Sequence, residues 1–526
     1  MSLRISIAIA AALLGCAMSC DADELSAAPT VAIREIRLQD NELIPEAVLD
    51  AILPAYSNRQ VSAQELQELA QRLTTYLVER GYVSSGVIVP DQKVSDGIVT
   101  LQVVAGHLTE AVIAGNRRLR DGYISQRLGD VYSSPLNVND IASRLQVLEQ
   151  DPRIERIDAA VKPGTARGAA VLNLNIEERR GFGFSVGADN YISPNVGSQQ
   201  VRAEIHHLNL TGFGDTLQLT YAHAEGYKGG SGAYSIPLTR WNTLLNVFFE
   251  RSSSRIVTEP FESLDIEGDT TRYGADLRQP VFRSPQSEFT LGLGLDVQKV
   301  ESFLLGEPFS FSVADDQGVS RTTAVSFSQE YVRSQASRVL ALRSSFTFGI
   351  DALDASVGGP SDGEFRYWLG QAQWLQKLDL WDSTVRVHGQ LRLADDALPA
   401  YRKYALGGAR SVRGYRENLI VRDNGGLLTL EWSLPIAHLA FPGLSSGQSD
   451  GEVRLTPFVD YGAGWDHDDE DNTFDMAGAG IAIRWQLAPN SYLELQAAKS
   501  LIERPIGASG HVLQDDGIYF SAQIGW

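Results

Sequence analysis

The pattern of apolar and polar residues changes near residue 180. Before that point, stretches with leucines at helical spacing, clearest over residues 62–80, alternate with short apolar runs typical of strands. After it, apolar or glycine residues alternate with polar ones, most regularly over residues 385–393. A strand with lipid on one face and water on the other needs this alternation, because successive side chains point to opposite faces. The sequence therefore predicts α+β structure first and membrane-spanning β-structure afterwards.

Two consecutive units before residue 180 repeat the order strand, helix, helix, strand, strand. In the first unit we expect strands over 31–38, 83–89 and 98–104 and helices over 46–53 and 62–80. In the second unit we expect strands over 108–113, 154–161 and 169–176 and helices over 122–128 and 139–149. The repeat predicts two small α+β domains, residues 30–105 and residues 106–179.

Sixteen alternating segments follow residue 180. They begin near Gly181, Ser198, Asp215, Gly229, Thr243, Gly268, Ser287, Thr322, Arg338, Phe365, Ser383, Gly426, Gly451, Thr473, Ser491 and Asp516. Short connections, such as residues 211–214, alternate with long ones, such as residues 398–424. An even strand number and this asymmetry of turns and loops are typical of outer-membrane barrels. We therefore expect a 16-stranded antiparallel transmembrane β-barrel over residues 180–526, although residues 435–450 form a longer turn than this rule predicts.

Residues 1–22 have the features of a secretory signal peptide. A basic residue precedes an apolar run from Ile5 to Met18 that is too short to span a bilayer. Lipidation of Cys16 and ordinary cleavage near Ser19 or Ala22 both remain open. The chain has two cysteines, both in this segment, so the rest of it can form neither a disulfide framework nor a thiolate metal site.

Composition and charge exclude several classes of function. The 48 glycines and the 45 aromatic residues (18 Tyr, 19 Phe and 8 Trp) suit tightly connected β-structure. A net charge of −20 argues against a nucleic-acid partner, because phosphate binding needs clustered Lys and Arg. We find no nucleophile elbow, phosphate loop or zinc signature, and neither the acidic run 466–471 nor His206-His207 has the spacing of a metal site. We therefore expect no catalytic residues, no metal and no cofactor.

Three short motifs lie in the predicted barrel. The connection between the eleventh and twelfth strands contains the sequence Val412, Arg413, Gly414 and Tyr415. The thirteenth strand carries Phe458, Asp460 and Gly462, which alternation places on the face toward the lumen. The last strand ends the chain with Phe520, Ile524 and Trp526 on one face.

The segments 79–83, 89–92 and 95–97 read Glu-Arg-Gly-Tyr-Val, Val-Pro-Asp-Gln and Ser-Asp-Gly. They resemble the first POTRA (polypeptide-transport-associated) domain of the two-partner secretion transporters, the hemolysin secretion/activation protein family of the POTRA-plus-barrel superfamily. The barrel motifs resemble the same family, and the likeness covers nearly all of the chain after the signal peptide. It implies an outer-membrane pore, with POTRA domains in the periplasm, that exports, or exports and activates, a hemolysin-like or adhesin-like secreted partner protein.

The resemblance also implies roles for the motif residues. Arg413, on a loop folded into the pore, is expected to pair with Asp460 on the lumen face of the thirteenth strand. The C-terminal residues are expected to be read by the barrel-assembly machinery, which inserts the barrel into outer-membrane lipid. Few residues separate the predicted cleavage site from Val31, so we expect no N-terminal plug helix. An assembly or insertion factor of the same superfamily and a passive porin are the alternatives; two POTRA domains favour export over the first and argue against the second.

Overall fold

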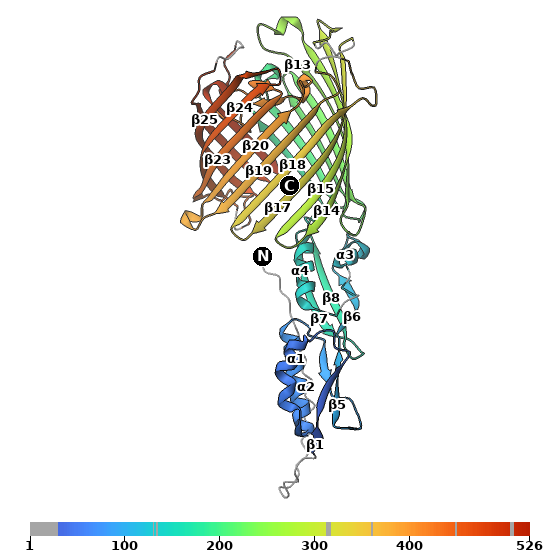
Figure 1. The fold of residues 1–526 in the computed structure, drawn as a ribbon. Helices are drawn as coiled ribbons and strands as arrows, with labels where there is room; N and C mark the ends of the chain where they lie inside the picture. Colours follow the sequence, from blue (N-terminus) through green and yellow to red (C-terminus); the bar gives the residue numbers. More distant parts are fainter. Residues whose placement is uncertain are drawn as a thin grey trace. The chain divides into compact units, whose positions relative to one another are not determined.

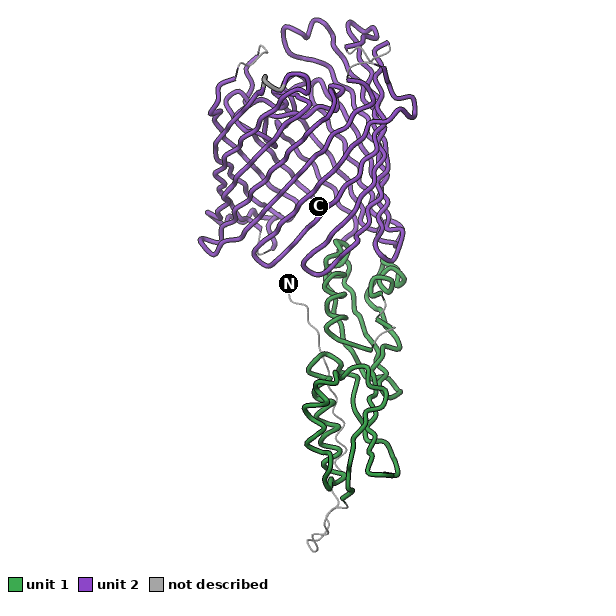
Figure 2. Tube along the Cα trace, viewed as in Figure 1, with its two compact units in different colours: residues 1–179 green, residues 180–526 purple. Residues whose placement is uncertain are grey.

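A computed structural model describes residues 30–526 except 130, 133–134, 312–316, 359–360, 448–449 and 505–509, and of residues 470–472 it describes the backbone alone. The predicted signal peptide and the question of a plug helix lie outside the described residues. The chain divides into two compact units, residues 1–179 and 180–526 (Figure 2). Among the described helices, none is both long enough and apolar enough to cross a membrane.

The first unit begins with a small α+β module. Its elements are β1 (Thr30–Ile33), β2 (Glu35–Gln39), α1 (Glu46–Ile52), η1 (Leu53–Tyr56), β3 (Arg59–Ser62), α2 (Ala63–Glu79), β4 (Gly86–Ile88) and β5 (Ile98–Val104). Helix α2 begins at a capping box in which the Glu65 N–H donates to the Ser62 hydroxyl and the Ser62 N–H donates to the Glu65 carboxylate. The second of these bonds lowers the pKa of Glu65. The leucines predicted at helical spacing are buried in the core of this module, together with residues of the sheet β2-β5-β4.

The strand predicted over residues 31–38 is in fact two strands. Strand β1 pairs with β3, whereas β2 pairs in parallel with β5. The buried residues Ile33 and Ile36 are three positions apart, so one continuous strand could not point both into the core. The chain changes partner at Arg34, whose N–H donates to the Gly97 carbonyl.

The second module repeats this design with its own core. Its elements are β6 (His107–Ala114), α3 (Asp121–Leu128), α4 (Val138–Glu149), β7 (Ile154–Pro163) and β8 (Ala169–Glu178). The sheet order is β6-β8-β7, and both helices pack on one core cluster that shares no residue with the core of the first module.

We expect residues 30–179 to fold without the barrel, because each module buries its own apolar residues. The isolated fragment should be monomeric, with a mixed α/β circular dichroism spectrum and a cooperative thermal transition. Ser62→Ala should lower its free energy of unfolding by about 1 kcal/mol through loss of the helix cap. A random-coil spectrum for the unmutated fragment would contradict the assignment of two modules.

The second unit is a closed antiparallel barrel (Figure 1). Its sixteen strands are β9 (Phe182–Asp189), β10 (Gln200–Leu208), β11 (Thr216–Ala224), β12 (Tyr227–Pro237), β13 (Leu244–Arg255), β14 (Glu267–Arg283), β15 (Ser287–Leu304), β17 (Val319–Gln335), β18 (Arg338–Ile350), β19 (Arg366–Lys377), β20 (Thr384–Ala394), β23 (Asn424–His438), β24 (Glu452–Asp466), β25 (Asp469–Ala488), β26 (Ser491–Ser500) and β27 (Ile518–Gly525). Strand β27 pairs with β9 and closes the sheet, and a two-residue strand, β16 (Glu307–Pro308), extends the loop after β15. The predicted 16-stranded barrel is confirmed.

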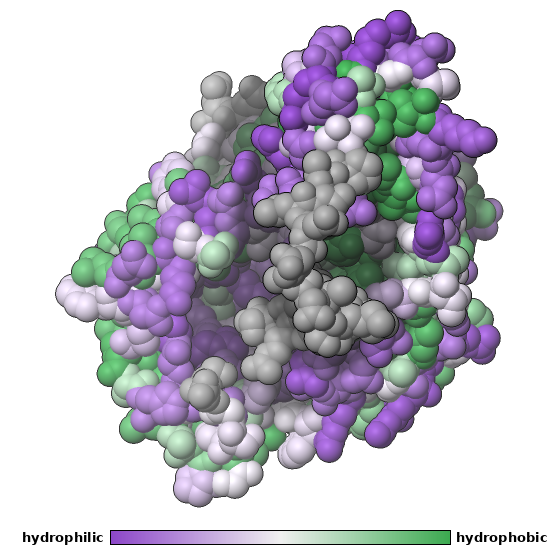
Figure 3. Space-filling view, turned by 90° about the horizontal axis from the view of Figure 1, so that it is seen from below, coloured by the Kyte–Doolittle hydropathy of each residue, from purple (hydrophilic) through white to green (hydrophobic). Residues whose placement is uncertain are grey.

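Alternation sorts the side chains of each strand into two environments. On β24, Val459 and Tyr461 are about half exposed on the outer surface, whereas Phe458 and Asp460 are buried on the inside. In the space-filling view, hydrophobic residues gather on the outer flank of the barrel, and hydrophilic residues line much of the hollow within (Figure 3). The strand face assigned to the lumen from the sequence is therefore the inner face.

Candidate functional site

The connection between β20 and β23 folds into the barrel. It contains η5 (Ala400–Arg402) and a short hairpin of β21 (Tyr404–Leu406) and β22 (Ile420–Arg422). Four of its apolar side chains are buried against two wall residues, one from β23 and one from β25. This cluster comprises Leu406, Val412, Tyr415, Ile420, Leu427 and Met476. We call residues 395–423 the pore loop, because its tip packs on the inner wall.

Arg413 and Asp460 meet at the centre of this contact. The Arg413 Nε donates to Asp460 Oδ2 at 2.7 Å and the Nη2 donates to Oδ1 at 2.8 Å, so the pair is bidentate. The Arg413 backbone N–H also donates to Oδ2, at 3.1 Å. Both residues are buried, with 5% of Arg413 and none of Asp460 exposed. One carboxylate thus fixes both the side chain and the backbone of the loop.

Two further wall residues complete the surroundings of the guanidinium. Its Nη1 lies 2.9 Å from Glu431 Oε1 on β23, and its carbon lies 3.3 Å from the centre of the Phe458 ring. Gly462, the third predicted residue on β24, leaves the space that Val412 fills, since a Cβ there would lie 2.7 Å from Val412 Cγ2. The motif on β24 therefore contributes a carboxylate, an aromatic face and a gap.

The two residues after Arg413 are held by the last strand and its neighbours. Gly414 has a φ of +96°, and a Cβ there would lie 2.7 Å from the Ser500 nitrogen, so this position requires glycine. The Gly414 N–H donates to the Tyr519 hydroxyl at 2.8 Å, and that hydroxyl donates to the Tyr415 carbonyl at 2.6 Å. The sequence did not identify Tyr519 as a site residue, because the C-terminal motif comprises residues of the opposite, outward face of the strand.

Two more arginines anchor the pore loop, and the sequence predicted neither. Arg402 forms an ion pair with Asp296 on β15. Arg416 forms a bidentate pair with Asp515, in the connection between β26 and β27, with distances of 2.5 and 2.7 Å. Since Arg413 binds β24, the loop is held at three separated sectors of the barrel wall. The sequence contains these charges, but their partners lie on strands distant in the chain.

The predicted C-terminal residues lie away from the pore loop. Ile524 and Trp526 are exposed on the outer surface, and Phe520 is half-buried on β27. The Trp526 ring stacks on Phe184 of β9 with centroids 6.0 Å apart, and the backbone N–H of Trp526 donates to the backbone carbonyl of Phe184 at 2.8 Å. These residues therefore lie at the seam that closes the barrel.

Candidate metal ligands do not gather within the described part of the chain, where no group of three His, Cys, Asp or Glu residues could hold an ion. At the start of the acidic run, Asp466, the last residue of β24, accepts a hydrogen bond from Lys403 of the pore loop at 2.9 Å and lies 3.4 Å from Arg422. This carboxylate therefore anchors the base of the loop.

The chain is similar to a set of known transport proteins. The family model described as haemolysin secretion/activation protein ShlB/FhaC/HecB matches residues 168–485, and that of the ShlB-type POTRA domain matches residues 31–106. The outer membrane transporter CdiB of Dickeya dadantii (strain 3937) is 22% identical, with 88% of this chain and 82% of the relative covered. The heme/hemopexin transporter protein HuxB of Haemophilus influenzae (strain 86-028NP) is 21% identical, with 90% and 84% covered. The solved structure of CdiB from Escherichia coli shares the fold, with a TM-score of 0.70, 19% identity, and 97% of this chain and 93% of that chain covered.

Proposed function

Because the chain belongs to the ShlB/FhaC/HecB family of haemolysin secretion/activation proteins, and is thus an outer-membrane transporter of two-partner secretion, we propose a route by which it exports its partner. The partner is an unfolded polypeptide that enters from the periplasm, passes through the barrel and folds outside. The observation that carries this proposal is the buried Arg413–Asp460 pair, which holds the pore loop inside the lumen.

The POTRA modules are proposed to receive the partner in the periplasm. Each module has a three-stranded sheet with unpaired outer edges, such as β6 in the order β6-β8-β7. An extended polypeptide can add to such an edge as a further strand, where main-chain bonds provide affinity with little demand on its sequence. This mode suits a partner that must be held unfolded before transport.

The pore loop is proposed to control the passage. Its three arginine anchors attach it to β15, β24 and the connection before β27, so the loop has a defined place in the lumen. A polypeptide can pass once the loop shifts along the wall. Folding of the partner on the far side would give the transport its direction. The outward C-terminal residues, including Trp526, are proposed to serve insertion by the barrel-assembly machinery.

Deletion of the first POTRA module tests the periplasmic step. The chain and its partner, a large secreted protein with an N-terminal β-helical export domain, should be produced together in a Gram-negative host. We expect removal of residues 30–105 to leave the barrel inserted and to reduce the exported partner at least about tenfold, because the docking edges of that module are lost. Partner in the medium and folded barrel in outer-membrane fractions are measured together. Undiminished export by the deletion variant would refute docking on this module.

A further inference from the structure

A cavity of about 650 Å³, lined mainly by polar and charged residues, lies inside the barrel on the periplasmic side of the pore loop. Its walls come from β19, β20 and β23 to β26, together with Tyr191, and the loop residues Ala409, Arg410 and Ser411 border it. Its wall residues include Thr384, the first residue of β20, and Tyr492, the second residue of β26, both next to periplasmic turns. A polypeptide entering the barrel from the periplasm reaches this cavity before it reaches the loop. We call it the entry chamber.

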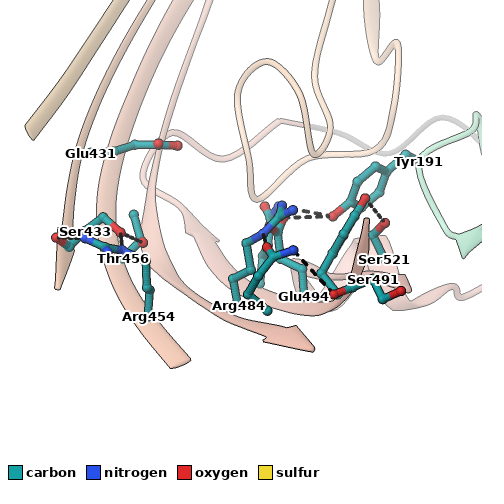
Figure 4. Close-up of polar contacts among 12 residues, drawn as sticks. Tyr191, Glu431, Ser433, Arg454, Thr456, Arg484, Ser491, Glu494 and Ser521 are labelled. Carbon is teal, nitrogen blue, oxygen red and sulfur yellow. Dashed lines mark hydrogen bonds and ion pairs between the residues drawn. The ribbon is translucent and has the colours of Figure 1, made fainter. Parts of the chain in front are cut away.

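The entry chamber is rich in arginine although the whole chain carries a net charge of −20. Its lining includes Arg386, Arg410, Arg413, Arg454 and Arg484, against the carboxylates of Glu431 and Glu494. Figure 4 shows Arg454 beside Ser433 and Thr456 on one side, and Arg484 beside Glu494 and Tyr191 on the other. The chamber therefore concentrates guanidinium groups within an anionic protein.

Four of these five arginines are occupied by carboxylates of the wall. The ion pairs are Arg386 with Glu431 at 2.6 Å, Arg413 with Asp460 at 2.7 Å, Arg454 with Glu452 at 2.5 Å and Arg484 with Glu494 at 3.1 Å. Each pair uses donors that would otherwise face the lumen. These four arginines therefore shape the chamber and have less capacity to bind another anion.

Arg410 differs from the other four. It is exposed to the chamber, and no carboxylate lies within ion-pair distance of it among the described residues. Its guanidinium lies 5.7 Å from the centre of the Tyr191 ring, a contact that leaves the N–H donors available. Three residues further along the chain, the Arg413–Asp460 pair fixes the backbone that carries it. The loop therefore presents to the lumen a guanidinium that is held in place and forms no ion pair with the described residues.

We propose that Arg410 binds carboxylate side chains of the unfolded partner as acidic segments enter the pore. This inference rests on the proposed export function. A guanidinium offers a planar fork that matches a carboxylate, and the wall carboxylates near it are already paired with other arginines. Because the site lies in water and forms a single pair, binding is weak enough for the polypeptide to move on. Arg413 positions the loop, and Arg410 contacts the cargo.

Ionic current through the full-length protein in planar bilayers tests the site without the natural partner. An oligoglutamate peptide added on the POTRA side should block the wild-type current for longer than oligoglutamine or oligolysine of equal length. Arg410→Gln should shorten the oligoglutamate block about fivefold, the effect of one solvent-exposed ion pair. Arg410→Lys should retain most of it. Arg240→Gln is the control, since Arg240 is also exposed, lies over an aromatic ring at 4.8 Å and belongs to the turn between β12 and β13.

Equal oligoglutamate block times for wild type and Arg410→Gln would overturn the proposal, as would equally long block by oligolysine. An equally shortened oligoglutamate block in Arg240→Gln would also overturn the proposal, because the effect would then come from the overall charge of the protein. Export of the natural partner is measured separately. If the wild-type protein shows the Arg410-dependent block but exports no partner, the proposed function fails while the carboxylate site stands. If the wild type exports its partner and Arg410→Gln leaves the block unchanged, only the Arg410 site fails.

Discussion

Arg413→Ala is expected to leave the barrel in the membrane and to reduce partner export about tenfold or more, because the pore loop loses its central anchor. The substitution leaves Asp460, which has no exposed surface, without its bidentate partner. Breaking a buried ion pair costs roughly 3–5 kcal/mol, and less where water can enter, as it can from the adjoining chamber. The strands of the barrel do not depend on this pair, since their main-chain bonds close the sheet independently.

The partner residue completes the test. Asp460→Ala should reduce export in the same way, although Arg413 keeps its contact with Glu431, 2.9 Å away. The double variant should be no worse than Arg413→Ala alone, because the two residues act as one unit. The measurement is exported partner divided by folded barrel for all four proteins. Normal export by Arg413→Ala at normal barrel abundance would refute the role of the loop, and strictly additive defects would refute the coupling.

Gly478→Ala is expected to give a defect like that of Arg413→Ala without removing any charged group. Gly478 lies opposite Asp460 in the register of β24 and β25. A Cβ at this position would overlap the carbonyl oxygen of Arg413, so the loop must move off the wall. Overpacking of this kind costs about 1–3 kcal/mol, and here the displacement also lengthens the bonds between Arg413 and Asp460.

The control is Gly389→Ala on β20. A Cβ there would have no neighbour closer than 3.8 Å, so the same substitution in the same kind of strand should leave export unchanged. Loop position is measured by the rate at which a cysteine introduced in place of Ser411 reacts with a polar thiol reagent; the rate should rise in Gly478→Ala. Export and labelling rates equal to those of the wild type would show that the loop tolerates the extra methyl group.

The architecture could be predicted from the sequence because strand alternation and helical spacing are patterns contained within single segments of the chain. Each wall strand must alternate between lipid and water, so residues such as those of 385–393 report their own environment. The same holds for helix α2, where the leucine spacing and the Ser62 cap are contained within one segment. The prediction of one strand over residues 31–38 was wrong because the chain pairs first with β3 and then with β5. The positions of these two strands cannot be read from residues 31–38 themselves.

Some features of the candidate site were likewise predictable from local sequence, and others were not. The residue pattern alone predicted that Arg413 lies in a loop and that Asp460 faces the lumen, since strand alternation fixes the side to which a residue points. The ion pairs of Arg402 with Asp296 and of Arg416 with Asp515 depend on the folded barrel. So does the position of Arg410, which forms no ion pair with the described residues. The folded barrel brings together residues that are about a hundred positions apart in the chain. Which side chains pair across the lumen depends on the register and tilt of the strands, and no local pattern of residues encodes these.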